Sequence, residues 1–104
     1  MLENKFKTNL IREIESDILP GSIVIHTDER QGFPDLIVLY NDRWAALEGK
    51  RTANASHRPN QDYYIDLMND MSYAAFIYPE NKEEVLSELQ SALQPGRRSR
   101  ISRR

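Results

Sequence analysis

Two acidic residues and a lysine are spaced so that together they could do metal-dependent chemistry. Asp35 immediately precedes an apolar stretch at residues 36–40, whereas Glu48 and Lys50 follow a second apolar stretch at residues 44–47. Both stretches are rich in residues that favour β-strands. The chemistry of the three polar residues therefore depends on how the two strands pair.

A tight turn between the stretches would set that pairing. Asn41 and Asp42 tolerate the positive φ angles of a two-residue hairpin loop. With that loop, Asp35 lies directly opposite Glu48, so their side chains point to the same face with Cβ atoms about 4.5–5.5 Å apart. Lys50 is two residues beyond Glu48 and therefore joins that face.

Two carboxylates held side by side repel each other, and a bound cation relieves that repulsion. Oxygen ligands of this kind suit Mg²⁺, and we expect that Mn²⁺ can substitute for it. A lysine beside the cation could hold a phosphate group or an attacking water. Asp35 and Glu48 are therefore the predicted metal ligands.

These residues also carry a resemblance to a known group of enzymes. Pro34-Asp35 followed by Glu48-x-Lys50 resembles the core of the PD-(D/E)XK nucleases. With Gly32 and Gln61 added, the pattern is similar to the small, phage-type VRR-NUC nucleases, which include Holliday-junction resolvases. The resemblance extends from residue 2 to about residue 93. Gly49 departs from it, because a larger apolar residue is usual at that position.

The resemblance implies a Mg²⁺-dependent endonuclease that hydrolyses DNA phosphodiester bonds, best matched to branched DNA. The metal held by Asp35 and Glu48 would polarise the phosphate and lower the pKa of a bound water. Lys50 would position that water or stabilise the developing negative charge. A four-way junction has two strands to cut, so we expect a symmetric homodimer, with its hydrophobic surface on the first or last helix.

Two further residues are expected at the site because the family has equivalents there. Glu3 falls within the apolar sector of a helix predicted over residues 2–19, where it could be a third acid and metal ligand. Alternatively, it lies in a frayed and exposed first turn, and Glu13 is then the substitute. Gln61 lies on the inward side of the first turn of a later helix, either near the metal or as a capping amide. We expect Asn60 to cap that helix.

Basic residues suggest where nucleic acid would bind. Residues 1–96 carry nine Lys or Arg against sixteen Asp or Glu, whereas residues 97–104 carry five Arg and no acid. An acidic body repels DNA, so phosphate contacts must be local. We expect them from the arginine tail and from the loop near Lys50, although that loop could be an ordinary solvated connection. The residues assigned to DNA binding are Lys50, Arg51, His57, Arg58, Arg97 and Arg98.

The pattern of elements predicts an α/β fold, and the resemblance implies that its core is restriction-endonuclease-like. The order is α-β-β-β-α-β-α, which gives a mixed four-stranded sheet flanked by helices. Residues 1–94 would form the nuclease domain, and residues 95–104 a basic, flexible tail. There are no cysteines, no apolar run long enough to span a membrane and no signal-peptide pattern, which suits a cytoplasmic protein. The resemblance to phage-type nucleases implies that it is phage-encoded and acts in the host cytoplasm.

Two other functions are compatible with the same residues. One is a non-catalytic DNA-binding or assembly protein that keeps the nuclease fold, although such a protein would be expected to have lost an acid or the lysine. The other is a nuclease of the same fold that acts on flaps or on a broad range of DNA.

Overall fold

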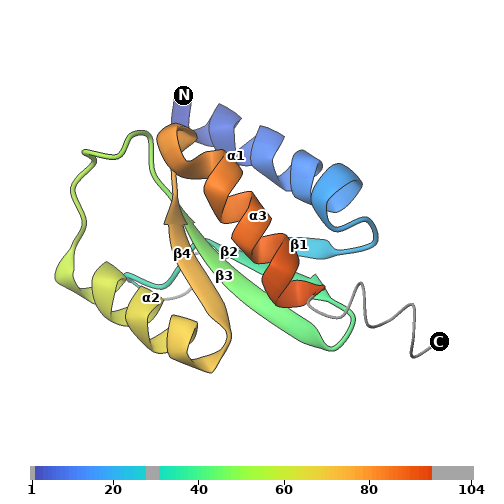
Figure 1. The fold of residues 1–104 in the computed structure, drawn as a ribbon. Coiled ribbons are helices and arrows are strands. Elements are labelled where there is room, and N and C mark those ends of the chain that lie inside the picture. Colours follow the sequence, from blue (N-terminus) through green and yellow to red (C-terminus); the bar gives the residue numbers. More distant parts are fainter. Residues whose placement is uncertain (1, 28–30, 95–104) are drawn as a thin grey trace.

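The chain forms a four-stranded sheet with helices on both faces (Figure 1). The computed structural model describes residues 2–27 and 31–94, with side chains from residue 5 onward. The predictions for the Glu3 side chain, for Arg97 and Arg98, and for the tail at 95–104 therefore lie outside the described part. The predicted order of helices and strands is confirmed: α1 (Leu2–Glu13), the π-helical turn η1 (Ile14–Ile18), β1 (Ile23–His26), β2 (Leu36–Tyr40), β3 (Arg43–Gly49), α2 (Pro59–Met71), β4 (Tyr73–Ile77), the 3-10 turn η2 (Pro79–Asn81) and α3 (Lys82–Leu93).

The sheet is mixed, as predicted. Its strands lie in the order β1-β2-β3-β4, with the first three antiparallel and β4 parallel to β3. Antiparallel strands can follow one another through short turns, whereas a parallel strand needs a crossover. Helix α2 provides that crossover and brings the chain back beside β3.

The hairpin of β2 and β3 has the predicted register. Asn41 adopts a φ of 55°, the left-handed conformation that asparagine tolerates in turns. Pairing then runs from Tyr40 opposite Arg43 to Leu36 opposite Leu47. Strand β3 continues beyond its pairing with β2 to Gly49, and its last residues pair with β4.

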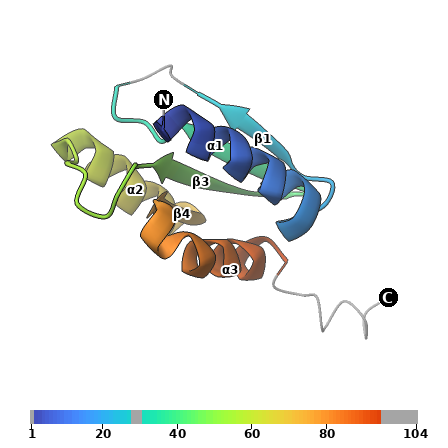
Figure 2. The ribbon, with the colours of Figure 1, turned by 90° about the horizontal axis from the view of Figure 1, so that it is seen from above.

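Alternation along the strands directs side chains into two layers, one on each face of the sheet. On one face, Leu36, Val38 and Leu47 pack against α1, η1 and α3. On the other, Ile37 and Ala46 pack against α2. Figures 1 and 2 show α1 and α3 side by side over the first face. Each fully buried Leu, Ile or Val side chain stabilises the fold by about 1.5–3 kcal/mol, so this pattern holds the hairpin firmly between the helices.

Exposed hydrophobic side chains concentrate on two strands and one helix. The large hydrophobic residues that remain exposed lie on β1, β2 and α2: Ile23, Ile25, Leu39, Tyr63, Leu67 and Met71. No described side chain of α1 or α3 belongs to this set. The structure thus does not support the expectation that the first or last helix offers the hydrophobic surface of a dimer. Within residues 2–27 and 31–94, no helix is long and apolar enough to cross a membrane.

Candidate active site

The two predicted metal ligands meet at the open end of the hairpin. One step beyond the pair Leu36–Leu47, the backbone N–H of Asp35 donates to Oε1 of Glu48 at 3.1 Å. In return, the backbone N–H of Gly49 donates to Oδ1 of Asp35 at 3.2 Å. Each carboxylate is therefore anchored through one oxygen by the backbone of the opposite strand, which holds the two acids side by side.

Lys50 and Gln61 join the acids from the α2 side. Nε2 of Gln61 donates to Oε2 of Glu48 at 3.1 Å, while Oε1 of Gln61 accepts from Nζ of Lys50 at 2.9 Å. Nζ of Lys50 lies 3.9 Å from Oε2 of Glu48 and also donates to the carbonyl of Ser56 at 3.3 Å. Glu48 and Lys50 are both buried, with exposed fractions of 7% and 9%. The structure therefore brings together four of the residues that the sequence analysis expected at the site: Asp35, Glu48, Lys50 and Gln61.

A second lysine, which the sequence reasoning missed, completes the cluster from the opposite layer. Lys7 projects from α1, and its Nζ forms an ion pair with Oδ2 of Asp35. Lys7 lies one helical turn after Glu3, so the argument that places Glu3 on the inward side of the helix also applies to Lys7. That spacing is the signal that could have identified it.

Asn60 positions the segment that leads into Asp35, and our prediction that it caps α2 is wrong. Helix α2 begins at Pro59, which fits the first helical position, and Arg58 is the N-cap residue. Nδ2 of Asn60 instead donates to the carbonyl of Gln31 at 3.0 Å. It packs so closely on Gly32, which has a φ of 85°, that a Cβ there would lie 2.4 Å from Cγ of Asn60.

The residues predicted to bind DNA are spread around the cluster. The His57 ring stacks on Phe76 with a centroid distance of 3.8 Å, and its Nδ1 lies 3.1 Å from Oδ1 of Asp62. The Arg58 side chain is exposed, while its backbone N–H donates to Oε1 of Gln61 at 3.0 Å. This loop therefore also supports Gln61.

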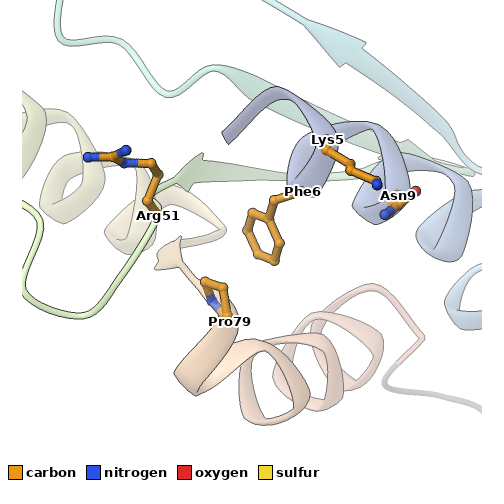
Figure 3. Close-up of a pocket in the computed structure, with 5 residues that line it drawn as sticks. All are labelled: Lys5, Phe6, Asn9, Arg51 and Pro79. Atoms are coloured by element: carbon orange, nitrogen blue, oxygen red, sulfur yellow. The ribbon is translucent and has the colours of Figure 1, made fainter. Parts of the chain in front are cut away.

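Arg51 lines a cavity beside α1. The cavity has a volume of about 290 Å³, and five residues line it: Lys5, Phe6, Asn9, Arg51 and Pro79. Figure 3 shows Phe6 reaching from α1 into the space between Arg51 and Pro79. Two basic side chains thus flank an apolar floor near the end of β3.

Glu13, the substitute for a third acid, has a different partner. Its Oε1 lies 3.0 Å from Nζ of Lys82, which ties α1 to the start of α3. Among the described residues, no group of three or more His, Cys, Asp or Glu side chains could hold a metal ion. Within that part of the chain, Asp35 and Glu48 form a pair.

The electrostatics of the pair favour a cation. Burial away from water and, second, the charge of the adjacent Asp35 raise the pKa of Glu48, which is about 7 overall. Lys50 and Lys7 oppose the shift. Two lysines therefore reduce, but do not remove, the cost of ionising Glu48 beside Asp35.

This raised pKa predicts how stability changes with pH in the metal-free protein. The folded state binds more protons than the unfolded state between pH 4.5 and 7, so the free energy of unfolding should fall as pH rises through that range. The contribution of Glu48 is at most about 3 kcal/mol. Denaturant titrations in EDTA at pH 5 and pH 8 measure it. Glu48→Gln should remove this part of the pH dependence, and an equal pH dependence in both proteins would contradict the prediction.

Comparison with solved structures identifies the fold. A structure described as a "VRR_NUC domain protein" matches 90% of this chain and 89% of its own, with a TM-score of 0.67 and 19% sequence identity. The fold is therefore of the VRR-NUC type, with the restriction-endonuclease-like core that the sequence predicts. At this identity the likeness concerns the fold alone. No model of a protein family matches the chain, and no curated protein does.

Proposed function

We propose that this protein is a Mg²⁺-dependent endonuclease that hydrolyses phosphodiester bonds in DNA. The observation that carries the proposal is the cluster at the open end of the hairpin. There, Asp35 and Glu48 lie side by side, and Lys50 and Gln61 contact Glu48. A VRR-NUC fold gives this cluster a setting that suits nucleic-acid chemistry.

The donor set fits a hard divalent cation. Each acid uses one oxygen for a backbone N–H, and its other oxygen is directed at cationic or amide groups. Mg²⁺ is bound in proteins through one or two carboxylates, with water and phosphate oxygens as its remaining ligands. Burial and the neighbouring charge of Asp35 raise the pKa of Glu48, and a bound cation would favour its ionised form. Asp35 and Glu48 would therefore hold the ion, and Glu3 stays a proposal as a third ligand.

The chain's own groups then have distinct tasks in hydrolysis. Mg²⁺, when bound, supplies Lewis-acid polarisation of the scissile phosphate. The ammonium of Lys50 would stabilise the negative charge that develops on the phosphate oxygens, or position the attacking water. Gln61 fixes both Lys50 and Glu48, because its amide binds one through Oε1 and the other through Nε2. Gln61 is therefore a positioning residue.

Branched DNA is the substrate that we propose, and a Holliday junction is its best-matched form. Cutting such a junction needs two sites, and a chain of 104 residues would provide them as a symmetric homodimer. Phosphate contacts would come from Arg51, Arg58 and His57 near the site, and from the tail arginines. A phage-encoded protein acting in the host cytoplasm is consistent with this proposal.

The rival functions predict different results in one experiment. Purified protein is incubated with four-way-junction, flap and linear duplex DNA, each with Mg²⁺, with Mn²⁺ and with EDTA. The proposal expects symmetric cuts in the junction that require either cation. Cleavage of flaps or duplex at equal rates would indicate a broader nuclease. Binding without cleavage under all conditions would indicate a non-catalytic protein and contradict the proposal.

A further inference from the structure

Lys7 reaches the acids from the layer opposite Lys50. Its Nζ pairs with Oδ2 of Asp35, whose other oxygen, Oδ1, accepts the backbone N–H of Gly49. The Lys7 side chain is only 16% exposed. Its ammonium therefore occupies the one oxygen of Asp35 that the backbone leaves available to a metal.

The side chain of Lys7 packs directly over Gly49. A Cβ at Gly49 would lie 3.1 Å from Cε of Lys7, which is closer than most Cβ contacts, and 3.4 Å from Cγ of Lys7, which is an ordinary contact distance. The backbone at Gly49 has no positive φ that would itself require glycine. A side chain at this position would therefore have to shift the lysine stem that crosses it.

We propose that Lys7 is a positioning residue that holds Asp35 until a divalent cation replaces it, so that Lys7 and the metal compete for the same carboxylate oxygen. This inference rests on the proposed function, because it assumes that Asp35 is a metal ligand. An ammonium and a divalent cation repel each other at contact distance, so each weakens the binding of the other at this oxygen. Until the metal binds, Lys7 limits the repulsion between Asp35 and Glu48.

The structure also offers Lys7 a place to move. A space of about 390 Å³ lies beside its stem, lined by Lys7, Thr8, Ile11 and His26. A lysine has four rotatable carbons, so its ammonium can move away from Asp35 into this space without displacing α1. Binding of a cation thus requires a change of side-chain conformation rather than a change of fold.

Calorimetric titration of the DNA-free protein with Mn²⁺ and with Mg²⁺ tests the competition directly. Lys7→Met keeps an unbranched stem over Gly49 but removes the charge. We expect this variant to bind either cation about tenfold more tightly than the wild type, the effect of removing one close, partly buried charge. Lys5→Met, an exposed change on the same helix, controls for the loss of general positive charge and should change the affinity less than twofold.

Thermal unfolding gives a second readout that does not depend on activity. In EDTA, Lys7→Met should melt at a lower temperature than the wild type, because the two acids lose a counterion. Saturating Mn²⁺ should raise its melting temperature by more than it raises that of the wild type, since tighter binding to the folded state stabilises it more.

Variants at Gly49, the last residue of β3, test the same competition between Lys7 and the metal ion. Gly49→Val should displace the Lys7 stem and so tighten metal binding, whereas in a Lys7→Ala background the same change should leave the metal affinity unaltered. This dependence of one substitution on the other is the signature of a direct contact.

The outcomes separate this inference from the proposed function. A wild-type protein that binds neither cation and cuts no DNA would overturn both. A wild-type protein that binds metal and cuts DNA, with Lys7→Met binding metal no more tightly, would overturn the role of Lys7 alone.

Discussion

Replacing Asp35 by Asn, or Glu48 by Gln, is expected to lower the rate of Mg²⁺-dependent DNA cleavage at least about a thousandfold. A bound cation supplies several kcal/mol of transition-state stabilisation, and each 1.4 kcal/mol corresponds to a factor of ten in rate. Both substitutions preserve shape while removing a charged ligand. Single-turnover cleavage of junction DNA, with metal binding measured in parallel, tests this expectation.

Misfolding would not account for such a loss. Removing one of two adjacent acids relieves repulsion, so Glu48→Gln should not lower the melting temperature of the metal-free protein at pH 8. Asp66→Asn removes an exposed charge on α2 and serves as the matched control, with an unchanged rate expected. If Asp35→Asn or Glu48→Gln cleaves as fast as the wild type, the acids do not form the catalytic site.

Lys50→Met should lower the cleavage rate by about 10²–10³-fold, the usual effect of removing one preorganised group that stabilises developing charge. Lys50 is held by Gln61 at 2.9 Å and lies 3.9 Å from Glu48. Methionine retains the buried stem, so packing changes little. The metal ligands stay in place, and loss of the positive charge beside them should leave metal affinity equal or higher.

Measuring both the cleavage rate and the metal affinity of Lys50→Met shows at which stage Lys50 acts. Loss of cleavage with metal affinity retained would assign Lys50 to the chemical step. Loss of both would assign it to the assembly of the metal site instead. Arg43→Met, at the exposed tip of the hairpin, removes one positive charge far from the acids and should cleave at the wild-type rate.

The sequence could predict the hairpin and its acids because local rules determine them. Asn41 permits the tight turn, and strict alternation of side chains then carries the register outward until Asp35 meets Glu48. Helical spacing placed Gln61 on the inward side of α2, and the family resemblance placed it near the acids. These inferences need no knowledge of how distant elements pack.

The remaining contacts around the site depend on tertiary packing, which local sequence patterns do not determine. Lys7 reaches Asp35 only because α1 lies across the sheet at a particular place. The close contact of Lys7 with Gly49 likewise depends on the position of α1. Asparagine is a common N-cap residue, but α2 already begins at Pro59, so Asn60 lies inside the helix. The Asn60 side-chain amide donates to the carbonyl of Gln31 instead. Such contacts between distant segments follow from tertiary structure.

The hairpin also determines where this chain could accept new residues. Five residue pairs separate the turn at Asn41 from the acids, and the helical layers hold the strands along that length. Residues added at the tip would lengthen a solvent-exposed loop and leave the acids in place, whereas one residue inserted within β3 before Glu48 would turn its side chain toward the opposite layer. The tip is therefore the point for grafting a peptide tag or a second domain onto this chain.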